Sequence, residues 1–256
     1  MTKLIYQYKI GISLNSAFRI PNSEFEGVVH MKILVLNGSP KGEKSDTLKM
    51  TRAFVGGMDG AEVSVVHVTE KNIGWCTGCF ACKHNGGRCV LHDDMGAVLE
   101  EMLQSDLVIY SFGLYSYGMP GALKNLLDRT MPLSSWNMYR DEEGKYGHKF
   151  QYDVSKMRFM MICGCGYPNS KHNFEGAVRS FELKYPDNVG IITVPESPMF
   201  SIPQAKQFVE PRLIALREAG AEFAENGRLS PETHASICSP MIPEEIYARF
   251  ANGEMK

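Results

Sequence analysis

The sequence contains no long hydrophobic run and no excess of charge of one sign. No apolar stretch approaches the roughly 20 residues that a membrane-spanning helix needs. The net charge is −2 over 256 residues, which gives no electrostatic reason to expect binding to nucleic acid or to an anionic membrane. Residues 1–30 do not resemble a signal peptide, because Gln7, Lys9 and Ser13 interrupt their apolar stretch and no small-residue cleavage site follows. We therefore expect a cytoplasmic protein that binds neither nucleic acid nor membrane.

The composition is otherwise that of a globular chain with a substantial core. It is 44% hydrophobic and 22% charged, and its length suits one large α/β domain with extensions. Residues 1–30 show no clear period. We expect them to be either an extension packed on the domain or an artefact of the start site, with Met31 as the natural start. Residues 31–227 form the expected domain, and residues 228–256 form a polar tail that wraps the domain or a partner.

Short apolar segments alternate with amphipathic segments after Met31. The first kind predicts buried strands and the second predicts helices. The expected strands are 32–37, 62–68, 106–111, 157–163 and 188–194, and the expected helices are 45–58, 94–104, 120–129, 172–184 and 210–225. We expect Pro211 to lie in the first turn of the last helix. This alternation predicts an α/β fold with a parallel sheet covered on both faces, in which ligands bind at the carboxyl ends of the strands.

The loop after the first strand, residues 37–47, leads into a helix through small and hydroxylated residues. Backbone N–H groups at a helix start attract phosphate. The loop matches neither the dinucleotide fingerprint nor the P-loop motif, which favours a phosphate monoester such as that of FMN. The alternative is an ordinary polar turn with Ser45 as the helix N-cap. Asp46 fits poorly, because a carboxylate near a phosphate is unfavourable unless it points away. The candidate phosphate ligands are Ser39, Lys41, Ser45 and Thr47.

The loop after the third strand, residues 111–121, is apolar and aromatic where a surface loop is normally polar. A flavin ring needs such a flat apolar slot. The alternative is a loop buried beneath the long insertion at residues 130–156, with its tyrosines in the core. The candidate flavin contacts are Leu114, Tyr115, Ser116, Tyr117, Gly118 and Met119.

Four of the seven cysteines lie close together in the spacing C-x2-C-x2-C-x6-C. They are Cys76, Cys79, Cys82 and Cys89. Thiolates at this compact spacing can hold an iron–sulfur cluster. Two alternatives stay open: a cluster-free or redox-active thiol loop, and a zinc site, although zinc sites usually split into two C-x2-C pairs with a long spacer.

Several motifs together carry a resemblance to a known family. They are Asn37-Gly38-Ser39-Pro40, residues 114–120 with Leu123-Lys124-Asn125 and Asp128-Arg129, and the cysteine loop ending in Asp93-Asp94-Met95. From Met31 to about Gly227 the chain resembles the NADPH-dependent FMN reductase and iron–sulfur flavoprotein group of the flavodoxin-like superfamily. The chain departs from the usual family pattern at Gly113, where proline is frequent, and at Asp46, where asparagine or glycine is frequent.

The resemblance implies a doubly wound, five-stranded parallel sheet of order 2-1-3-4-5 with a C-terminal extension. It also implies non-covalent FMN, NAD(P)H as the reductant, and a [4Fe-4S] cluster as a candidate cofactor of the cysteine loop. The loop Cys163-Gly164-Cys165-Gly166-Tyr167-Pro168, after the fourth strand, would meet the flavin from its other side, with Cys163 and Gly164 as its candidate contacts. Cys163 and Cys165 are two residues apart in a strand, so their spacing does not suit a disulfide, and we interpret them as small residues that end the strand.

The expected function is an FMN-dependent oxidoreductase that passes electrons from NAD(P)H to a quinone, a flavin or another acceptor. The alternative is an electron-transfer module with an iron–sulfur cluster. Because the hydride chemistry belongs to the flavin, no side chain is assigned a catalytic role. Tyr115, Tyr117 and Trp75 are candidates to shape the acceptor pocket, with Trp75 alternatively a core anchor beneath the cysteine loop. The expected partners are a small-molecule acceptor or a redox protein, and a second copy of the chain in a homodimer or higher homo-oligomer.

Overall fold

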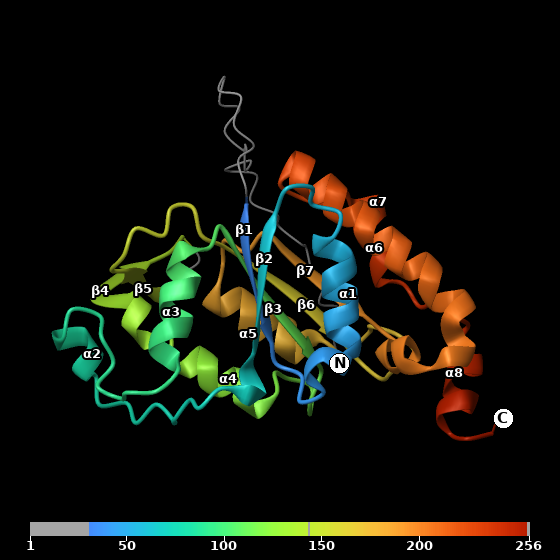
Figure 1. Ribbon diagram of the computed structural model, residues 1–256, viewed down its shortest axis with the longest axis horizontal. Coiled ribbons are helices and arrows are strands. Elements are labelled where there is room, and N and C mark those ends of the chain that lie inside the picture. The colour runs from blue at the N-terminus through green and yellow to red at the C-terminus, as the bar shows by residue number, and fades with distance from the viewer. Residues whose placement is uncertain (1–30, 143, 255–256) are drawn as a thin grey trace, which may run out of the picture.

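The fold is built on a five-stranded parallel sheet. The computed structural model describes residues 31–142 and 144–254 (Figure 1), so the expectation for residues 1–30 lies outside the described residues. The strand order is β2-β1-β3-β6-β7. The strands are β1 Lys32–Asn37, β2 Glu62–His67, β3 Leu107–Gly113, β6 Arg158–Gly164 and β7 Gly190–Val194. Because β4 and β5 lie outside this sheet, its order is the predicted 2-1-3-4-5, and the flavodoxin-like fold class is confirmed.

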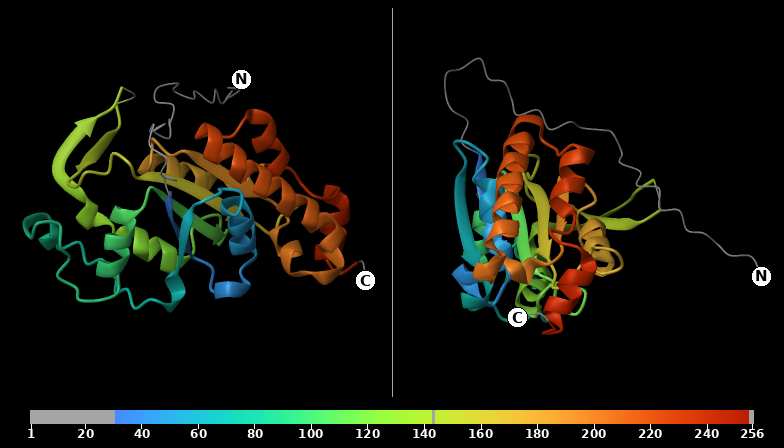
Figure 2. Two further views of the ribbon diagram at one scale, coloured as in Figure 1. Left: turned by 45° about the horizontal axis from the view of Figure 1, so that its top comes forward. Right: turned by 90° about the vertical axis from the view of Figure 1, so that its right-hand side faces the viewer.

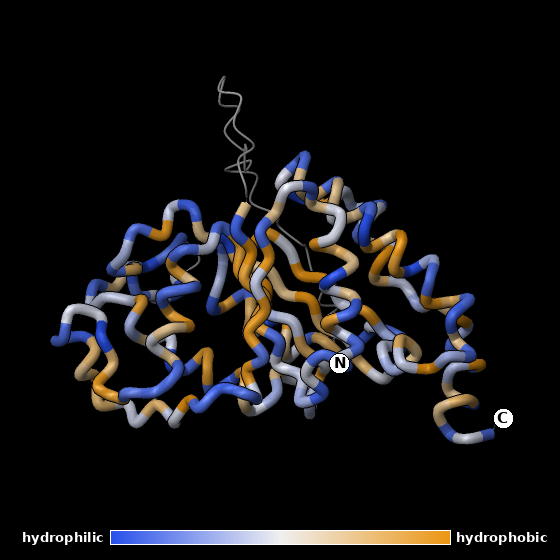
Figure 3. Tube along the Cα trace, in the orientation of Figure 1, coloured by the Kyte–Doolittle hydropathy of each residue, from blue (hydrophilic) through white to orange (hydrophobic). Residues whose placement is uncertain are grey.

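Burial explains why the three central strands are apolar along most of their length. In β1, β3 and β6 nearly every residue is buried, whereas the edge strands β2 and β7 are partly exposed. A parallel strand with helices on both faces has no solvent-facing side, so it does not alternate polar and apolar residues. Figure 3 shows the resulting concentration of hydrophobic residues along the middle of the molecule.

Helices cover both faces of the sheet (Figure 1). One apolar core lies between the sheet and α3, α4 and α5, and a second lies between the sheet and α1 and α6. The helices are α1 Asp46–Val55, α2 Ala81–His84, α3 Met95–Gln104, α4 Gly121–Asp128, α5 Glu175–Lys184 and α6 Lys206–Asn226. Short 3-10 turns join them at η1 Gly42–Lys44, η2 Val68–Glu70, η3 Met131–Leu133, η4 Ser197–Ser201 and η5 Pro203–Ala205. None of the helices in the described part of the chain is long and apolar enough to cross a membrane.

The start of α6 differs from the sequence prediction. The helix begins at Lys206 rather than at residue 210, directly after η5. Pro211 therefore lies inside the helix and not in its first turn. Since proline has no N–H, the carbonyl four residues earlier, that of Gln207, loses its normal helical donor.

Two further segments extend the sheet domain. The insertion after α4 forms an antiparallel hairpin of β4 Ser134–Arg140 and β5 Tyr146–Phe150, which stands apart from the main sheet (Figure 2). The segment after Gly227 forms α7 Pro231–Cys238 and α8 Glu244–Ala251. Ile237 and Tyr247 from these helices are buried in the same core as α1 and α6.

A buried carboxylate holds the C-terminal helices to the sheet. Glu196 follows β7 and is fully buried, and its Oε2 accepts the backbone N–H of Met241. Its Oε1 has no hydrogen-bond partner within the described residues. Arg212 of α6 donates to the carbonyl of Ile237 and to Ser239 Oγ. Burial raises the pKa of Glu196, although backbone N–H groups oppose the shift.

The hydrogen bond from the Met241 N–H to Glu196, here called the Glu196 tether, predicts different outcomes for two substitutions. A raised carboxyl pKa means that Glu196 stabilises the fold at acidic pH and that this contribution is lost as pH rises through the raised pKa. At pH 8, Glu196→Gln should leave the free energy of unfolding unchanged or higher, because an amide oxygen still accepts the Met241 N–H. Glu196→Ala should lower it by about 1–3 kcal/mol, because a buried N–H is left unpaired. Urea unfolding at pH 5 and pH 8 measures both, and equal losses in the two variants would contradict the tether.

Candidate functional site

The loop between β1 and α1 is shaped by Asn37. Its buried side chain donates to the Gly42 carbonyl at 3.1 Å and accepts the Ser39 N–H at 3.2 Å. Ser45 is the N-cap of α1, since its Oγ accepts the Leu48 N–H at 3.2 Å. The loop is therefore held by its own polar groups before any ligand arrives.

The start of α1 offers several polar groups to an anion. The N–H groups of Asp46 and Thr47 have no hydrogen-bond acceptor elsewhere in residues 31–142 and 144–254. Ser39, Ser45 and Thr47 are all buried beside them, between 1% and 6% exposed. Unsatisfied N–H groups at a helix start, with hydroxyls close by, suit a phosphate. The N-cap role of Ser45 and a phosphate-binding role of the loop are thus compatible.

The position of Asp46 explains how a carboxylate can stand in this loop. Its Oδ2 pairs with Lys41 Nζ at 2.7 Å, and its Oδ1 accepts the hydroxyl hydrogen of Ser201 in η4. Lys49 lies 3.7 Å away on the same helix. The ammonium groups of Lys41 and Lys49 therefore offset the negative charge of Asp46. The Asp46 side chain also links the loop between β1 and α1 to η4. Lys41, which was predicted from the sequence to bind phosphate, forms an ion pair with Asp46 in this structure.

The aromatic loop after β3 is a tight turn with two residues in the left-handed region. Tyr115 and Gly118 exchange backbone hydrogen bonds of 3.0 and 2.9 Å, and the two residues between them have φ values of 47° and 63°. This is the geometry of a two-residue hairpin turn, which normally uses glycine or asparagine. Tyr115 and Tyr117 are 48% and 53% exposed. The alternative that they belong to a core beneath the insertion is therefore wrong.

The loop after β6 lies directly against the aromatic loop. The Leu114 N–H donates to the Gly164 carbonyl at 2.7 Å. Cys163 and Cys165 are both buried free thiols, and burial raises the pKa of Cys165 to about 11. Their place at the end of β6 agrees with the interpretation that they are small residues terminating a strand.

Gly113 marks the point where three loops meet. A Cβ added to it would lie 3.8 Å from the Tyr115 ring, 3.9 Å from Thr47 Oγ1 and 4.0 Å from the Gly164 carbonyl oxygen. The loop between β1 and α1, the aromatic loop and the loop after β6 thus surround one position at the carboxyl edge of the sheet. The N–H groups and hydroxyls at the start of α1 and the exposed rings of the aromatic loop lie around this position, and such groups suit a phosphate joined to a flat ring.

The family resemblance gave Tyr167 a role only as one member of the loop after the fourth strand, and the structure places it beside Tyr117. The two rings are nearly parallel, with centroids 6.0 Å apart and an interplanar angle of 11°. Hydrogen bonding to Tyr117 raises the pKa of the Tyr167 phenol. The one available sequence signal was its position in the loop that leaves the fourth strand of the sheet.

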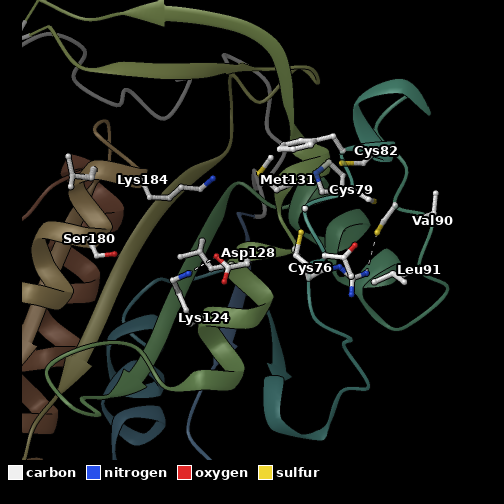
Figure 4. A pocket seen from close by; sticks show the side chains of 18 residues that line it. Cys76, Cys79, Cys82, Val90, Leu91, Lys124, Asp128, Met131, Ser180 and Lys184 are labelled. Atoms are coloured by element: carbon white, nitrogen blue, oxygen red, sulfur yellow. Dashed lines mark hydrogen bonds and ion pairs between the residues drawn. The ribbon is translucent and has the colours of Figure 1, made fainter.

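The four clustered cysteines line a separate pocket of about 590 Å³ (Figure 4). Cys76 and Cys79 are exposed, Cys82 is buried and Cys89 is half-buried. Figure 4 shows the labelled cysteines on one side, with Lys124 and Lys184 on the other. Within the described ranges, no three His, Cys, Asp or Glu side chains converge closely enough to hold a metal ion. The thiols therefore share a pocket but do not form a closed coordination sphere in this structure.

A buried ion pair holds both ends of the cysteine loop. The Arg129 guanidinium, with 1% of its side chain exposed, contacts Asp93 through two hydrogen bonds of 2.7 and 2.9 Å and donates to the Gly74 carbonyl at 2.7 Å. Asp93 accepts the N–H groups of Gly74 and Met95 in turn. Arg129 also approaches Cys89 Sγ at 3.5 Å. Both residues lie in the motifs that carry the family resemblance, but the sequence alone gave them no role.

The outer part of the cysteine loop packs on the β4–β5 hairpin. Lys83 of α2 donates to the carbonyl oxygens of Met131 and Ser134, and the rings of Phe80 and Trp136 lie 5.4 Å apart. Trp75, by contrast, is 75% exposed, so the alternative that it is a core anchor is wrong.

The Asp93–Arg129 pair predicts a pH-dependent stability. Hydrogen bonds from Arg129 hold the pKa of Asp93 below its usual range, so the pair stabilises the fold above that range and its contribution is lost as pH falls through the lowered pKa. Asp93→Asn should cost about 3–5 kcal/mol at pH 7, because it leaves a buried guanidinium without a counter-charge. The difference from wild type should shrink below pH 4.

The matched control is Asp128→Asn, which removes the exposed partner of Lys124. A surface pair of this kind contributes about 0–1 kcal/mol, so this variant should unfold close to wild type. Guanidinium unfolding between pH 3 and pH 7 measures both variants. Equal destabilisation by the two substitutions would contradict a special role for the buried pair.

Comparisons with known proteins agree with the fold and with the motifs. The sequence profile of the NADPH-dependent FMN reductase family matches residues 31–150. An iron–sulfur flavoprotein of Methanocaldococcus jannaschii is 31% identical over 115 residues, which is 44% of this chain and 59% of that protein. One from Archaeoglobus fulgidus is 34% identical over 102 residues, 39% of this chain and 49% of that protein. The chain thus spans about half of the length of these curated relatives.

Solved structures extend the fold similarity beyond residue 150. An NAD(P)H:quinone oxidoreductase from Methanothermobacter marburgensis has a TM-score of 0.53 at 17% identity, covering 76% of this chain and 99% of that chain. A putative quinone reductase from Klebsiella pneumoniae has a TM-score of 0.58 at 17% identity, covering 78% and 87%. At these identities the likeness concerns the fold alone. Residues 31–150 are thus similar to the NADPH-dependent FMN reductase family, and the fold of the described chain is flavodoxin-like.

Proposed function

We propose that the protein is an FMN-dependent oxidoreductase that passes electrons from NAD(P)H to a quinone, a flavin or another acceptor. The observation that carries this proposal is the meeting of three loops at Gly113, at the carboxyl edge of the sheet. Ligands of open α/β sheets bind at this edge. The family of the matched segment supports the same cofactor.

Each loop would hold a different part of FMN. The N–H groups of Asp46 and Thr47, with the nearby hydroxyls, would bind the phosphate. The aromatic loop from Leu114 to Met119 would line one side of the ring, and Cys163 with Gly164 would approach it from the loop after β6. Bound FMN would supply the electron transfer, with the balance NAD(P)H + H⁺ + quinone → NAD(P)⁺ + hydroquinone.

The protein's own groups bind and orient rather than exchange protons with the substrate. Burial and a raised pKa keep the Cys165 thiol protonated, and the phenols of Tyr115 and Tyr117 stand at the open side of the site. No side chain is therefore assigned as a general acid or base. The acceptor would reach the site from the side of the exposed tyrosines.

Removal of one hydroxyl tests the phosphate site. Thr47→Val keeps the shape of a side chain whose hydroxyl has no hydrogen-bond partner among the described residues, so the fold should be unaffected. A hydrogen bond to a charged group contributes about 1.5–3 kcal/mol, so FMN should bind about 10- to 100-fold more weakly. Riboflavin, which has no phosphate, is the control and should bind equally well to both proteins. Fluorescence titration measures the two dissociation constants, and an equal loss for riboflavin would contradict the assignment.

A second candidate function rests on the cysteine pocket. We propose as the alternative that Cys76, Cys79, Cys82 and Cys89 hold a [4Fe-4S] cluster and that the protein transfers electrons between this cluster and FMN. All four thiols line one pocket, and relatives that match this chain are named iron–sulfur flavoproteins. Four thiolates are the usual donor set of such a cluster. The exposed thiols of Cys76 and Cys79 would have to turn toward the buried Cys82.

Iron analysis separates the two candidates. If the cluster forms, anaerobically reconstituted wild type should contain iron and sulfide, and Cys79→Ala should lose most of both. Cys238→Ala, in α7 and away from the loop, is the control and should keep them. Anaerobic absorbance spectra and iron and sulfide assays make the measurement. Wild-type protein without iron after reconstitution would eliminate the alternative and leave the oxidoreductase proposal standing.

A further inference from the structure

Two exposed tyrosines lie together beside the residues proposed to hold the flavin. Tyr117 comes from the loop after β3 and Tyr167 from the loop after β6, and these two strands are neighbours in the sheet. Their rings are 11° from parallel with centroids 6.0 Å apart, and the Tyr167 hydroxyl donates to the Tyr117 hydroxyl at 3.2 Å. Large parts of both rings are open to solvent, 53% of Tyr117 and 41% of Tyr167.

The backbone beneath each ring is fixed by contacts that do not depend on the rings. On one side, the left-handed turn holds Tyr117, and the first turn of α5 packs so closely against it that a Cβ on Gly176 would lie 2.9 Å from the Tyr117 carbonyl oxygen. On the other side, the Tyr167 carbonyl accepts the N–H of the buried Glu196 at 2.9 Å. Both anchors are therefore rigid, and the rings project from them as a preformed pair.

We propose that Tyr117 and Tyr167 form an aromatic clamp that binds the flat ring of the electron acceptor. This inference rests on the proposed oxidoreductase function and makes the two tyrosines its specificity-determining residues. Offset aromatic stacking favours a planar ring on the exposed faces. The Tyr167 hydroxyl donates to the Tyr117 hydroxyl, so the hydroxyl hydrogen of Tyr117 can be donated to a carbonyl oxygen of the acceptor.

The chemistry of the pair selects one acceptor class. A flat ring that carries carbonyl oxygens, such as a naphthoquinone, uses both the ring faces and the hydroxyls. A compact, non-aromatic complex such as hexacyanoferrate(III) uses neither. The clamp therefore affects binding of the first kind of acceptor and leaves electron transfer to the second unchanged.

Direct binding of menadione tests the clamp without turnover. Equilibrium dialysis of menadione against oxidised, flavin-loaded protein should show about tenfold weaker binding for Tyr167→Ala, because an aromatic contact beyond its buried area is worth about 0.5–1.5 kcal/mol. Tyr167→Phe, which keeps the ring, should stay within about threefold of wild type. Tyr167→Leu is a bulkier second variant that guards against local collapse and should behave like the alanine variant. Tyr146→Ala, which removes an exposed tyrosine on β5, should bind menadione as wild type does.

Turnover with two acceptors supplies the second readout. Tyr167→Ala should raise KM for menadione and leave the rate with hexacyanoferrate(III) at the wild-type value. Menadione binding within twofold of wild type in both Tyr167→Ala and Tyr167→Leu would overturn the clamp, and so would an equal loss with both acceptors. Wild-type protein whose bound flavin is not reduced by NAD(P)H would instead refute the proposed function, and dialysis of the flavin-loaded protein would still decide on the clamp.

Discussion

The register of the three central strands is the constraint on which the site depends. Asn37 at the end of β1 pairs with Ser111 of β3, and Gly113 at the end of β3 pairs with Gly164 of β6. Because the strands are parallel, their loops leave the sheet at one edge and at nearly one level. Slipping any of these strands by one residue would turn its buried side chains to the other face. The two apolar cores therefore fix the position of the loops as well as the fold.

Buried polar groups then give each loop its shape. Asn37 closes the phosphate loop, Arg129 with Asp93 joins the two ends of the cysteine loop, and Glu196 joins the C-terminal helices to the loop after β7. Such groups are costly to bury unless they are hydrogen-bonded. Their partners here are mostly backbone atoms of loops. These hydrogen bonds therefore stabilise the conformation of segments that have little apolar surface of their own.

The sequence predicted the elements that depend on apolar periodicity. The five strands and the helices of the two cores follow from runs such as 32–37 and 106–111, since burial on both faces leaves a clear pattern. The order of the strands came from the family resemblance and is confirmed. The start of α6 was placed four residues late, because proline was assumed to need the first turn, whereas η5 leads straight into the helix. The helical state of the segment after Gly227 was not predicted, because its polar composition hides the few residues that become buried.

Contacts between residues that are distant in the chain could not be predicted from the sequence. The role of Asp46 depends on Ser201 in η4, and the role of Tyr167 depends on Tyr117. No sequence spacing indicates either partner, because each pair joins loops that follow different strands. The loops after β1 and β3, for which phosphate and flavin contacts are proposed, do lie at the carboxyl edge of the sheet as predicted, since topology alone places them there.

At the left-handed turn of Ser116 and Tyr117, the residues that would best stabilise the backbone differ from the residue whose ring is proposed to bind the acceptor. Two consecutive residues with positive φ are best accommodated by asparagine and glycine, and a bulky ring there strains the backbone. An Asn-Gly turn would relax this strain but would remove the ring that faces Tyr167. Substitutions that stabilise a protein often reduce function at strained sites. Stabilising changes at this turn would therefore remove part of the surface proposed to bind the acceptor, and thermostability screens would select against that surface.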